Sequence, residues 1–183
     1  MSEYRYPVEI VHLFVSPGHN YFGRSPEGGI GDHPTEDRDE IELIAGRGIV
    51  GDRFFDKGHD FDGHVTFFAS EAREGADYAK LRRNIVTRGL PGTALIGHTF
   101  ELVPRVEGAL PLRFSGTKHC APCRWLDHAM GEGTMADLRG RGGLRAQVLN
   151  TGTLSKASLY ELVSPVELDG TAPGKRLPRP RLP

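Results

Sequence analysis

The chain has 183 residues, of which 38% are hydrophobic and 26% are charged, and this composition is typical of one globular domain that buries its own core. Its formal net charge of −1 gives no general attraction to nucleic-acid phosphates, so we expect no nucleic acid among its partners. The sequence has no apolar run long enough to cross a membrane and no signal-peptide pattern at its start, which favours a cytoplasmic protein with no membrane partner.

The 24 glycines and 13 prolines are spread along the chain, which is typical of short strands separated by tight turns and favours a mainly β fold. The first strand is predicted at 8–15, where residues are apolar on both faces and often β-branched. Residues 16–39 are rich in Gly, Pro and Asp and predict a long loop. Further strands are predicted at 40–45, 63–69, 98–103, 110–115, 143–149 and 158–163.

Alternation and capping signals refine these elements. Leu110, Leu112 and Phe114 alternate with other residues and are expected to share one face of their strand. The clearest helix is predicted at 70–82, because Ser70 is a residue type that caps helices and basic residues at the far end complement the helix dipole. Shorter helices are predicted at 123–130 and 134–139.

The end of the chain differs from the rest in composition. From Ser164 onward it is rich in Pro and Arg, residue types that cannot bury enough apolar surface to order a segment. We therefore predict a single domain over residues 1–163 and a solvated tail over 164–183.

The seven positions from Lys118 to Arg124 include two thiols, an imidazole and two cations. Two cysteines cannot build a disulfide framework, so the CxxC spacing of Cys120 and Cys123 indicates metal or redox chemistry. Thiolate is the reactive form of cysteine, and neighbouring cations favour it. An inert, buried pair of cysteines is the alternative without function.

Three functions fit these residues on their own. The first is a CxxC redox pair of the thioredoxin type. The second is a structural zinc site, which would have to recruit His119, His128 or more distant histidines as further ligands. The third is a single thiolate that binds a transition metal or carries sulfur, with the neighbouring cations holding an anionic cofactor.

Two other segments concentrate groups that bind anions: Gly51-Asp52-Arg53 and Arg82-Arg83-Asn84. A guanidinium offers paired donors that match a phosphate, and the Asn side chain both donates and accepts hydrogen bonds. His12 lies in an apolar strand and is expected to be a satisfied core histidine. The segment around His59 and His64 lacks a well-placed third metal ligand and is expected to be a polar loop without metal.

Four short blocks follow one another along the chain: Gly48-Ile49-Val50-Gly51-Asp52-Arg53, Arg83-Asn84-Ile85, Cys120-x-x-Cys123, and Gly142-x-x-x-x-x-Val148-Leu149-x-x-Gly152. In this order the blocks resemble the MOSC domain, the molybdenum cofactor sulfurase C-terminal domain, and the resemblance spans about residues 40–163. It implies a mainly β protein, a MOSC-type closed β-barrel with a few short helices. It also implies a role in binding the molybdenum cofactor (molybdopterin) or in carrying sulfur.

The same resemblance assigns roles to residues. The functional cysteine falls on Cys123, which is the expected catalytic residue, because in relatives of the amidoxime-reducing type the second cysteine of a CxxC ligates molybdenum. The residues expected around the cofactor are Arg53, Arg83, Asn84, Lys118, His119 and Cys120. This agrees with the chemistry of the residues, because a molybdopterin phosphate needs cations and molybdenum favours thiolate.

The expected function is therefore that of a small molybdoenzyme that reduces N-hydroxylated small molecules, or of a sulfur or cofactor carrier. Its protein partners would deliver electrons or the cofactor, since no flavin or haem motif is visible. No pyridoxal-phosphate site is visible either, so this chain by itself is not expected to mobilise sulfur from cysteine. A noncatalytic binding protein on the same barrel and a CxxC thiol redox protein remain the alternatives.

Overall fold

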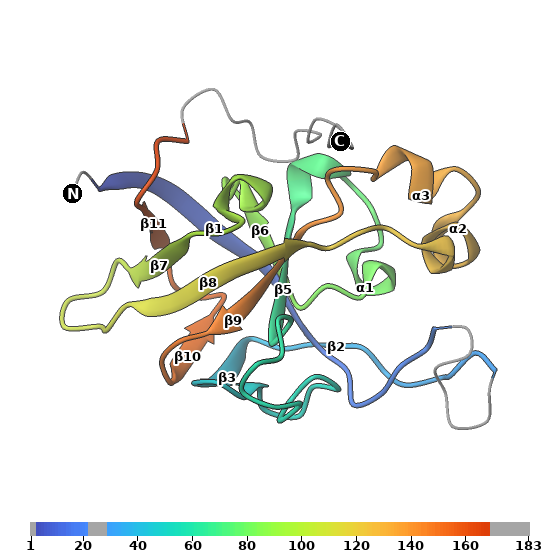
Figure 1. Ribbon diagram of the computed structural model, residues 1–183, viewed down its shortest axis with the longest axis horizontal. Helices are drawn as coiled ribbons and strands as arrows, with labels where there is room; N and C mark the ends of the chain where they lie inside the picture. The colour runs from blue at the N-terminus through green and yellow to red at the C-terminus, as the bar shows by residue number, and fades with distance from the viewer. Residues whose placement is uncertain (1–2, 22–28, 169–183) are drawn as a thin grey trace.

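Seven strands close into a β-barrel in the computed structural model, which describes residues 3–21 and 29–168 (Figure 1). The strands follow the order β11-β7-β8-β9-β5-β6-β1, and pairing of β1 with β11 closes the ring. Their bounds are β1 Tyr4–Val15, β5 Val65–Ala69, β6 Ile85–Arg88, β7 Thr99–Pro104, β8 Leu112–His119, β9 Leu144–Val148 and β11 Tyr160–Ser164. The mainly β, closed-barrel fold predicted from the sequence is confirmed.

Smaller elements surround the barrel. The two-residue strand β2 (Glu36–Asp37) pairs with the end of β1, and a second sheet combines β10 (Gly152–Ser155), β3 (Glu40–Ile44) and β4 (Gly48–Ile49). The helices are short: η1 (Ser70–Ala72), α1 (Tyr78–Leu81), η2 (Gly92–Leu95), α2 (Arg124–Met130) and α3 (Thr134–Asp137). In the part of the chain that the structure describes, no helix is long and apolar enough to cross a membrane.

The first strand is long because it closes the barrel. Its first half pairs with β11 and its second half with β6, and the register shifts between Ile10 and His12. Such a bulge bends a strand and increases its twist, which lets one strand serve two neighbours around a closed barrel. Strands β5 and β6 pair in parallel, and a parallel pair needs a crossover connection. Residues 70–84 supply it and carry η1 and α1 outside the barrel.

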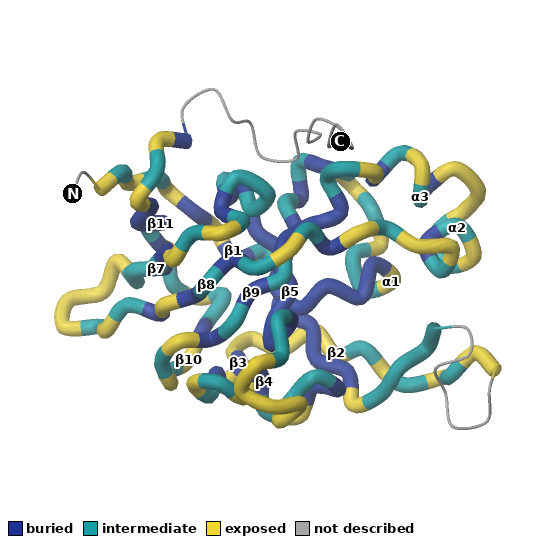
Figure 2. Tube along the Cα trace, viewed as in Figure 1, coloured by how far each residue is buried: buried dark blue, intermediate teal, exposed yellow. Residues whose placement is uncertain are grey.

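The barrel interior is packed with large apolar side chains. Phe67, Phe100 and Phe114 form a three-ring cluster with centroid distances of 5.2–5.7 Å, and all three are fully or almost fully buried. Figure 2 shows buried residues concentrated on the strands, whereas many loops on the periphery are exposed. A second apolar cluster, which includes Phe68 and Leu126, packs the helices against the outside of the barrel.

All seven expected strands are present. The predicted ranges match β1, β3, β5, β7, β8, β9 and β11 to within a few residues. Strands β2, β4, β6 and β10 were not predicted, because they are short and give little alternation, and β2 lies inside the predicted loop 16–39. The expected face of β8 is wrong in one position: Leu112 and Phe114 are buried, but Leu110 precedes the strand and is 81% exposed.

The predicted helix at 70–82 is wrong as a continuous element. The chain forms the short η1 and α1 instead, and no side-chain hydrogen bond caps either of them. Gly75 has a φ of +70°, a left-handed conformation that interrupts a right-handed helix. The expected helices at 123–130 and 134–139 correspond to α2 and α3.

The last described residues pack against the barrel. Leu168 is buried, and its N–H donates to the Tyr6 hydroxyl at 2.7 Å. The predicted division between a domain at 1–163 and a tail at 164–183 stays a prediction. Most of the predicted tail, 169–183, lies outside the described residues.

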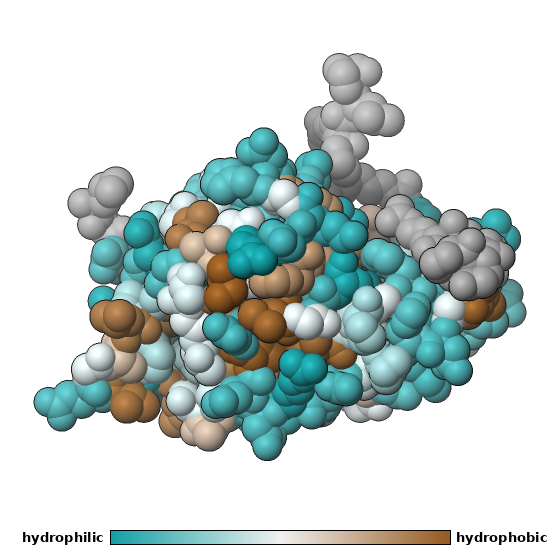
Figure 3. Space-filling view, turned by 90° about the horizontal axis from the view of Figure 1, so that it is seen from below, coloured by the Kyte–Doolittle hydropathy of each residue, from teal (hydrophilic) through white to brown (hydrophobic). Residues whose placement is uncertain are grey.

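Val106 and Leu110, between β7 and β8, are exposed, and Figure 3 shows apolar side chains at this left-hand end of the molecule.

Gly116 in β8 provides a test of the packing between this strand and η2. A Cβ atom there would lie 2.2 Å from the carbonyl oxygen of Leu95 in η2, and backbone contacts of this kind cannot relax easily. We expect Gly116→Ala to lower the free energy of unfolding by about 2 kcal/mol or more. Urea unfolding measures the change. Gly29→Ala, where the added methyl group meets nothing within 4 Å, is the control, and equal stability of the two variants would contradict the packing.

Candidate functional site

A cavity of about 460 Å³ opens beside the barrel. The turn after β4, the start of β6, the chain between β8 and α2, and β9 all contribute to its wall. Five arginines line it, namely Arg53, Arg82, Arg83, Arg124 and Arg145, and no Asp or Glu among the described residues does. The cavity is therefore strongly cationic in a chain whose net charge is close to zero.

Four charged side chains are buried in the described part of the chain: Asp52, Arg53, Arg82 and Arg83. The three arginines line this cavity, and Asp52 pairs with Arg53. We call these four residues the cationic floor. Three guanidinium groups are buried with one carboxylate, which leaves a formal excess of two positive charges. Burying uncompensated charge is costly, so this arrangement favours an anionic ligand.

Arg82 illustrates the electrostatic cost. Burial, and then repulsion from Arg53, lowers the pKa of Arg82 to about 10, so the group still carries its charge at neutral pH. Its Nη2 atom donates to the Ser16 hydroxyl at 3.0 Å and to the Gly18 carbonyl. The Nε atoms of Arg82 and Arg53 are buried and have no hydrogen-bond partner among the described residues.

Asp52 organises the turn that carries Arg53. Its carboxylate accepts hydrogen bonds from the N–H groups of Ser16 and Phe54, from Asn84 Nδ2 at 3.0 Å and from Arg53 Nη1 at 3.2 Å. Asn84 also donates to the Phe14 carbonyl and accepts from Thr66. Asn84 is thus occupied in joining β1, β5 and β6 to this turn.

Arg83 ties three main-chain segments together. It donates from Nε to the Gly142 carbonyl at 2.9 Å, from Nη1 to Leu81 at 3.0 Å and from Nη2 to Cys120 at 3.4 Å. Gly142 can come this close only because it lacks a Cβ, which would lie 2.4 Å from the Cys120 carbonyl oxygen. Arg83 therefore fixes the cysteine segment relative to the start of β9.

The two cysteines differ in environment. Both line the cavity and both are free thiols. Cys120 is buried, and its N–H donates to the Gly143 carbonyl at 2.8 Å. Cys123 is exposed and immediately precedes α2. Of the two, Cys123 is the thiol that a ligand in the cavity can reach.

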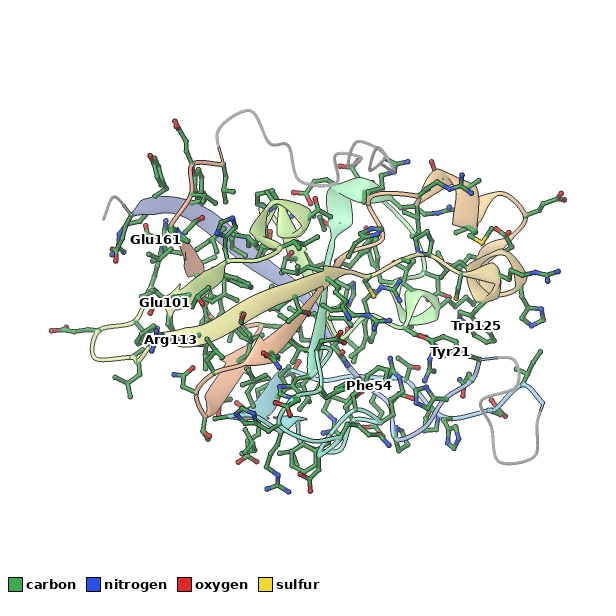
Figure 4. All side chains as sticks on the ribbon, in the orientation of Figure 1. Tyr21, Phe54, Glu101, Arg113, Trp125 and Glu161 are labelled. Carbon is green, nitrogen blue, oxygen red and sulfur yellow. The ribbon has the colours of Figure 1, made fainter. Side chains whose placement is uncertain are left out.

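Aromatic side chains form the outer side of the cavity. Tyr21, Phe54, Phe61 and Trp125, which we call the aromatic wall, all line it. Phe54 lies 5.5 Å from Phe61, and Tyr21 lies 6.0 Å from Trp125, measured between ring centroids. Figure 4 shows Tyr21 and Trp125 side by side near α2. The Arg53 guanidinium lies 4.6 Å above the Phe54 ring, a cation–π contact that joins the wall to the cationic floor.

The structure brings four of the seven predicted site residues to the cavity, namely Arg53, Arg83, Cys120 and Cys123. The other three do not line it. Asn84 lies beneath it against Asp52, Lys118 pairs with Asp62 on the surface, and His119 accepts a hydrogen bond from the Gly142 N–H. The functional roles of all seven stay predictions.

Other residues of the site were not among the seven assigned from the family resemblance. The sequence analysis does name Arg82 in an anion-binding segment and Arg124 as a cation of the cysteine segment, and both line the cavity. Phe61, Trp125 and Arg145 had no signal in the sequence, because only the folded barrel brings their segments to one cavity. Tyr21 lies in the long predicted loop, whose unusual length was the only indication of function.

The histidines considered as metal ligands have other surroundings. His64 is buried, its Nδ1 accepts from the Val148 N–H at 3.3 Å, and its Nε2 lies 3.2 Å from the Gly58 carbonyl oxygen. His12 is not a core residue as expected, because it is half-exposed and lies 2.7 Å from Asp37. Within 3–21 and 29–168, no group of three or more His, Cys, Asp or Glu residues is arranged to hold a metal ion.

Comparisons with known proteins agree on the fold. The MOSC domain family matches residues 62–158, more than half of the chain. The YuaD protein from Bacillus subtilis has a similar structure, with a TM-score of 0.63 and 13% sequence identity over 91% of this chain and 99% of that one. A second similar structure, described as a hypothetical protein, has a TM-score of 0.51 and 19% sequence identity to this chain. The match covers 87% of this chain and 69% of that one. No curated protein matches the sequence.

His119 makes the site sensitive to pH. Burial, and then repulsion from Arg83, lowers the pKa of His119 from its ordinary value of 6.5. The neutral imidazole accepts the Gly142 N–H at 3.1 Å, so the folded state favours it. This contribution to stability is complete above the unfolded pKa and is lost as pH falls below about 6.5, because the unfolded chain then binds the proton first.

We therefore expect the melting temperature of the wild-type protein to fall more steeply between pH 7 and pH 5 than that of His119→Gln. Glutamine supplies an acceptor oxygen at a similar position but does not titrate in this range. His59→Gln, at a side chain that is 91% exposed, should follow the wild-type profile. Parallel profiles for the wild type and His119→Gln would contradict the assignment.

Proposed function

Because the chain belongs to the MOSC domain family, we propose that its cavity binds the molybdenum cofactor and that the protein acts as a small reductase of N-hydroxylated compounds. The observation that carries this proposal is the excess of positive charge on the cationic floor. Three buried guanidinium groups against one carboxylate are suited to a phosphate dianion, whose oxygens accept paired hydrogen bonds from arginine.

The residues present fit such a cofactor. The buried Nε atoms of Arg53 and Arg82 lack partners within the described residues, so this part of the site has donor capacity that the protein does not use. Arg83 is largely committed to main-chain carbonyls and contributes charge more than free donors. Arg53 and Arg82 would therefore hold the phosphate, with Arg83 supporting them.

Cys123 would supply the ligand to molybdenum. Its thiol is exposed at the cavity, whereas Cys120 is buried, and a soft thiolate suits a metal of this kind. When bound, the cofactor supplies the two-electron chemistry that removes oxygen from a substrate. The chain itself binds the phosphate, holds the cysteine segment through Arg83 and limits the access of water with the aromatic wall.

The aromatic wall favours the reductase over a carrier. A carrier needs only an accessible thiol, but here four aromatic rings line the same cavity as Cys123. Such a surface contacts a small molecule near the metal ligand. The electrons would come from a partner protein. The carrier role remains the second candidate, because the exposed Cys123 thiol is also suited to holding a persulfide.

Replacing each cysteine separately tests the assignment. We expect wild-type protein purified from cells that make the cofactor to contain molybdenum and a fluorescent pterin. Cys123→Ser should lose the metal, because serine offers no soft thiolate, while Cys120→Ser should retain part of it. Elemental analysis and pterin fluorescence measure both outcomes.

Three results would exclude this account, and each favours a named alternative. Equal damage from both substitutions, together with an intramolecular disulfide in the oxidised protein, would identify a thiol redox pair. Absence of both molybdenum and pterin from the wild type would favour a noncatalytic MOSC protein. Sulfane sulfur bound to Cys123 without molybdenum would favour the carrier.

A further inference from the structure

A second electrostatic cluster lies at the edge of the cavity, where β8 and β9 pair. Lys118 and Arg145 are register partners across these two strands, and like charges directly opposite each other normally destabilise a sheet. Asp62 contacts both. Its carboxylate forms an ion pair with Lys118 Nζ, and its Oδ1 lies 3.8 Å from Arg145 Nη1. One carboxylate is therefore shared between two cations.

The main chain fixes the position of Asp62. The Thr117 hydroxyl donates to the Asp62 carbonyl oxygen and lies 3.0 Å from that of Arg145. Gln147 Nε2 donates to the carbonyls of His59 and Phe61, at 3.3 and 3.2 Å. The register of β8 and β9 shifts at this point, between Gly116 and Lys118, and bulges of this kind re-aim side chains beside functional sites. These bonds anchor the main chain around Asp62 beside the pair of β8 and β9.

The two cations are not equivalent. Arg145 lines the cavity, but Lys118 does not, and the Lys118 side chain is 67% exposed. The 3.8 Å separation between Asp62 and Arg145 is too long for a direct hydrogen bond, and such a loose, partly exposed ion pair contributes little energy. Arg145 can therefore leave Asp62 at low cost, while Lys118 continues to neutralise the carboxylate.

We propose that Arg145 binds the outward-facing part of the anionic ligand in this cavity and that Asp62 and Lys118 control its availability. In the free protein Arg145 is held near Asp62. When the anion enters, the guanidinium turns to it, and Lys118 keeps Asp62 paired. This inference rests on the proposed function only in that the cavity binds an anion, and it assigns Lys118 a positioning role in place of direct contact with the ligand.

The proposal predicts effects of opposite sign from two substitutions in one ion pair. Asp62→Asn removes the carboxylate that competes for Arg145, so binding of inorganic phosphate should tighten by about two- to fivefold, the range expected for an exposed ion pair. Lys118→Gln leaves Arg145 as the remaining partner of Asp62, so phosphate binding should weaken by a similar factor. In an Arg145→Gln background both effects should vanish. Isothermal titration calorimetry with inorganic phosphate at constant ionic strength measures each dissociation constant.

A matched pair elsewhere on the surface controls for the change in net charge. Lys156 Nζ lies 3.1 Å from Asp37 Oδ1, and neither residue lines the cavity. Asp37→Asn and Lys156→Gln make the same chemical changes and should leave the dissociation constant for phosphate unchanged after correction for ionic strength. Equal shifts in the two pairs would overturn the proposal, because they would reflect net charge alone.

The remaining outcomes separate this inference from the proposed function. If the wild type binds phosphate but Lys118→Gln binds it equally well or more tightly, the role of Arg145 is wrong and the anion site stands. Lys118 is exposed, so this variant remains informative even if Asp62→Asn fails to fold. If neither the wild type nor any variant binds phosphate, the anion site and this inference both fall.

Discussion

The burial of three guanidinium groups against one carboxylate is the constraint on which the rest of the site depends. Arg53, Arg82 and Arg83 are each at least nine-tenths buried, and Asp52 is the single acidic side chain buried with them in the described part of the chain. In a low-dielectric setting this arrangement is costly without an anion. A bound anion would offset this free-energy cost by restoring the charge balance. Because the formal excess is two positive charges, a dianion matches the site best.

The barrel makes this concentration of charge possible. Its closed ring brings the ends of distant strands to one edge, so the turn after β4, the start of β6 and the chain after β8 meet there. Asn84 and Asp52 use their hydrogen-bonding groups to join these segments. Arg83 adds the cysteine segment through main-chain carbonyls. Part of the cationic floor therefore supports the architecture that creates the cavity.

The sequence predicts those features that local pattern controls. Alternating and β-branched segments located seven of the strands, and the motif blocks selected Arg53, Arg83 and Cys123, which line one cavity. The sequence could not predict side-chain clusters that form only when distant strands pair. Asp62, Lys118 and Arg145 form a cluster only because β8 and β9 pair with a register shift. The helix predicted at 70–82 is interrupted by a glycine in the left-handed conformation. The prediction gave more weight to the capping and charge signals of this segment than to that glycine.

The most direct test of the excess charge is the melting temperature of the cofactor-free wild-type protein as inorganic phosphate replaces chloride at constant ionic strength. A ligand that binds the folded state raises stability in proportion to the logarithm of its concentration once the site is saturated. We predict this rise for phosphate and a smaller effect for monovalent chloride. Equal melting temperatures in the two anions across the whole range would contradict the assignment of the cationic floor as a dianion site.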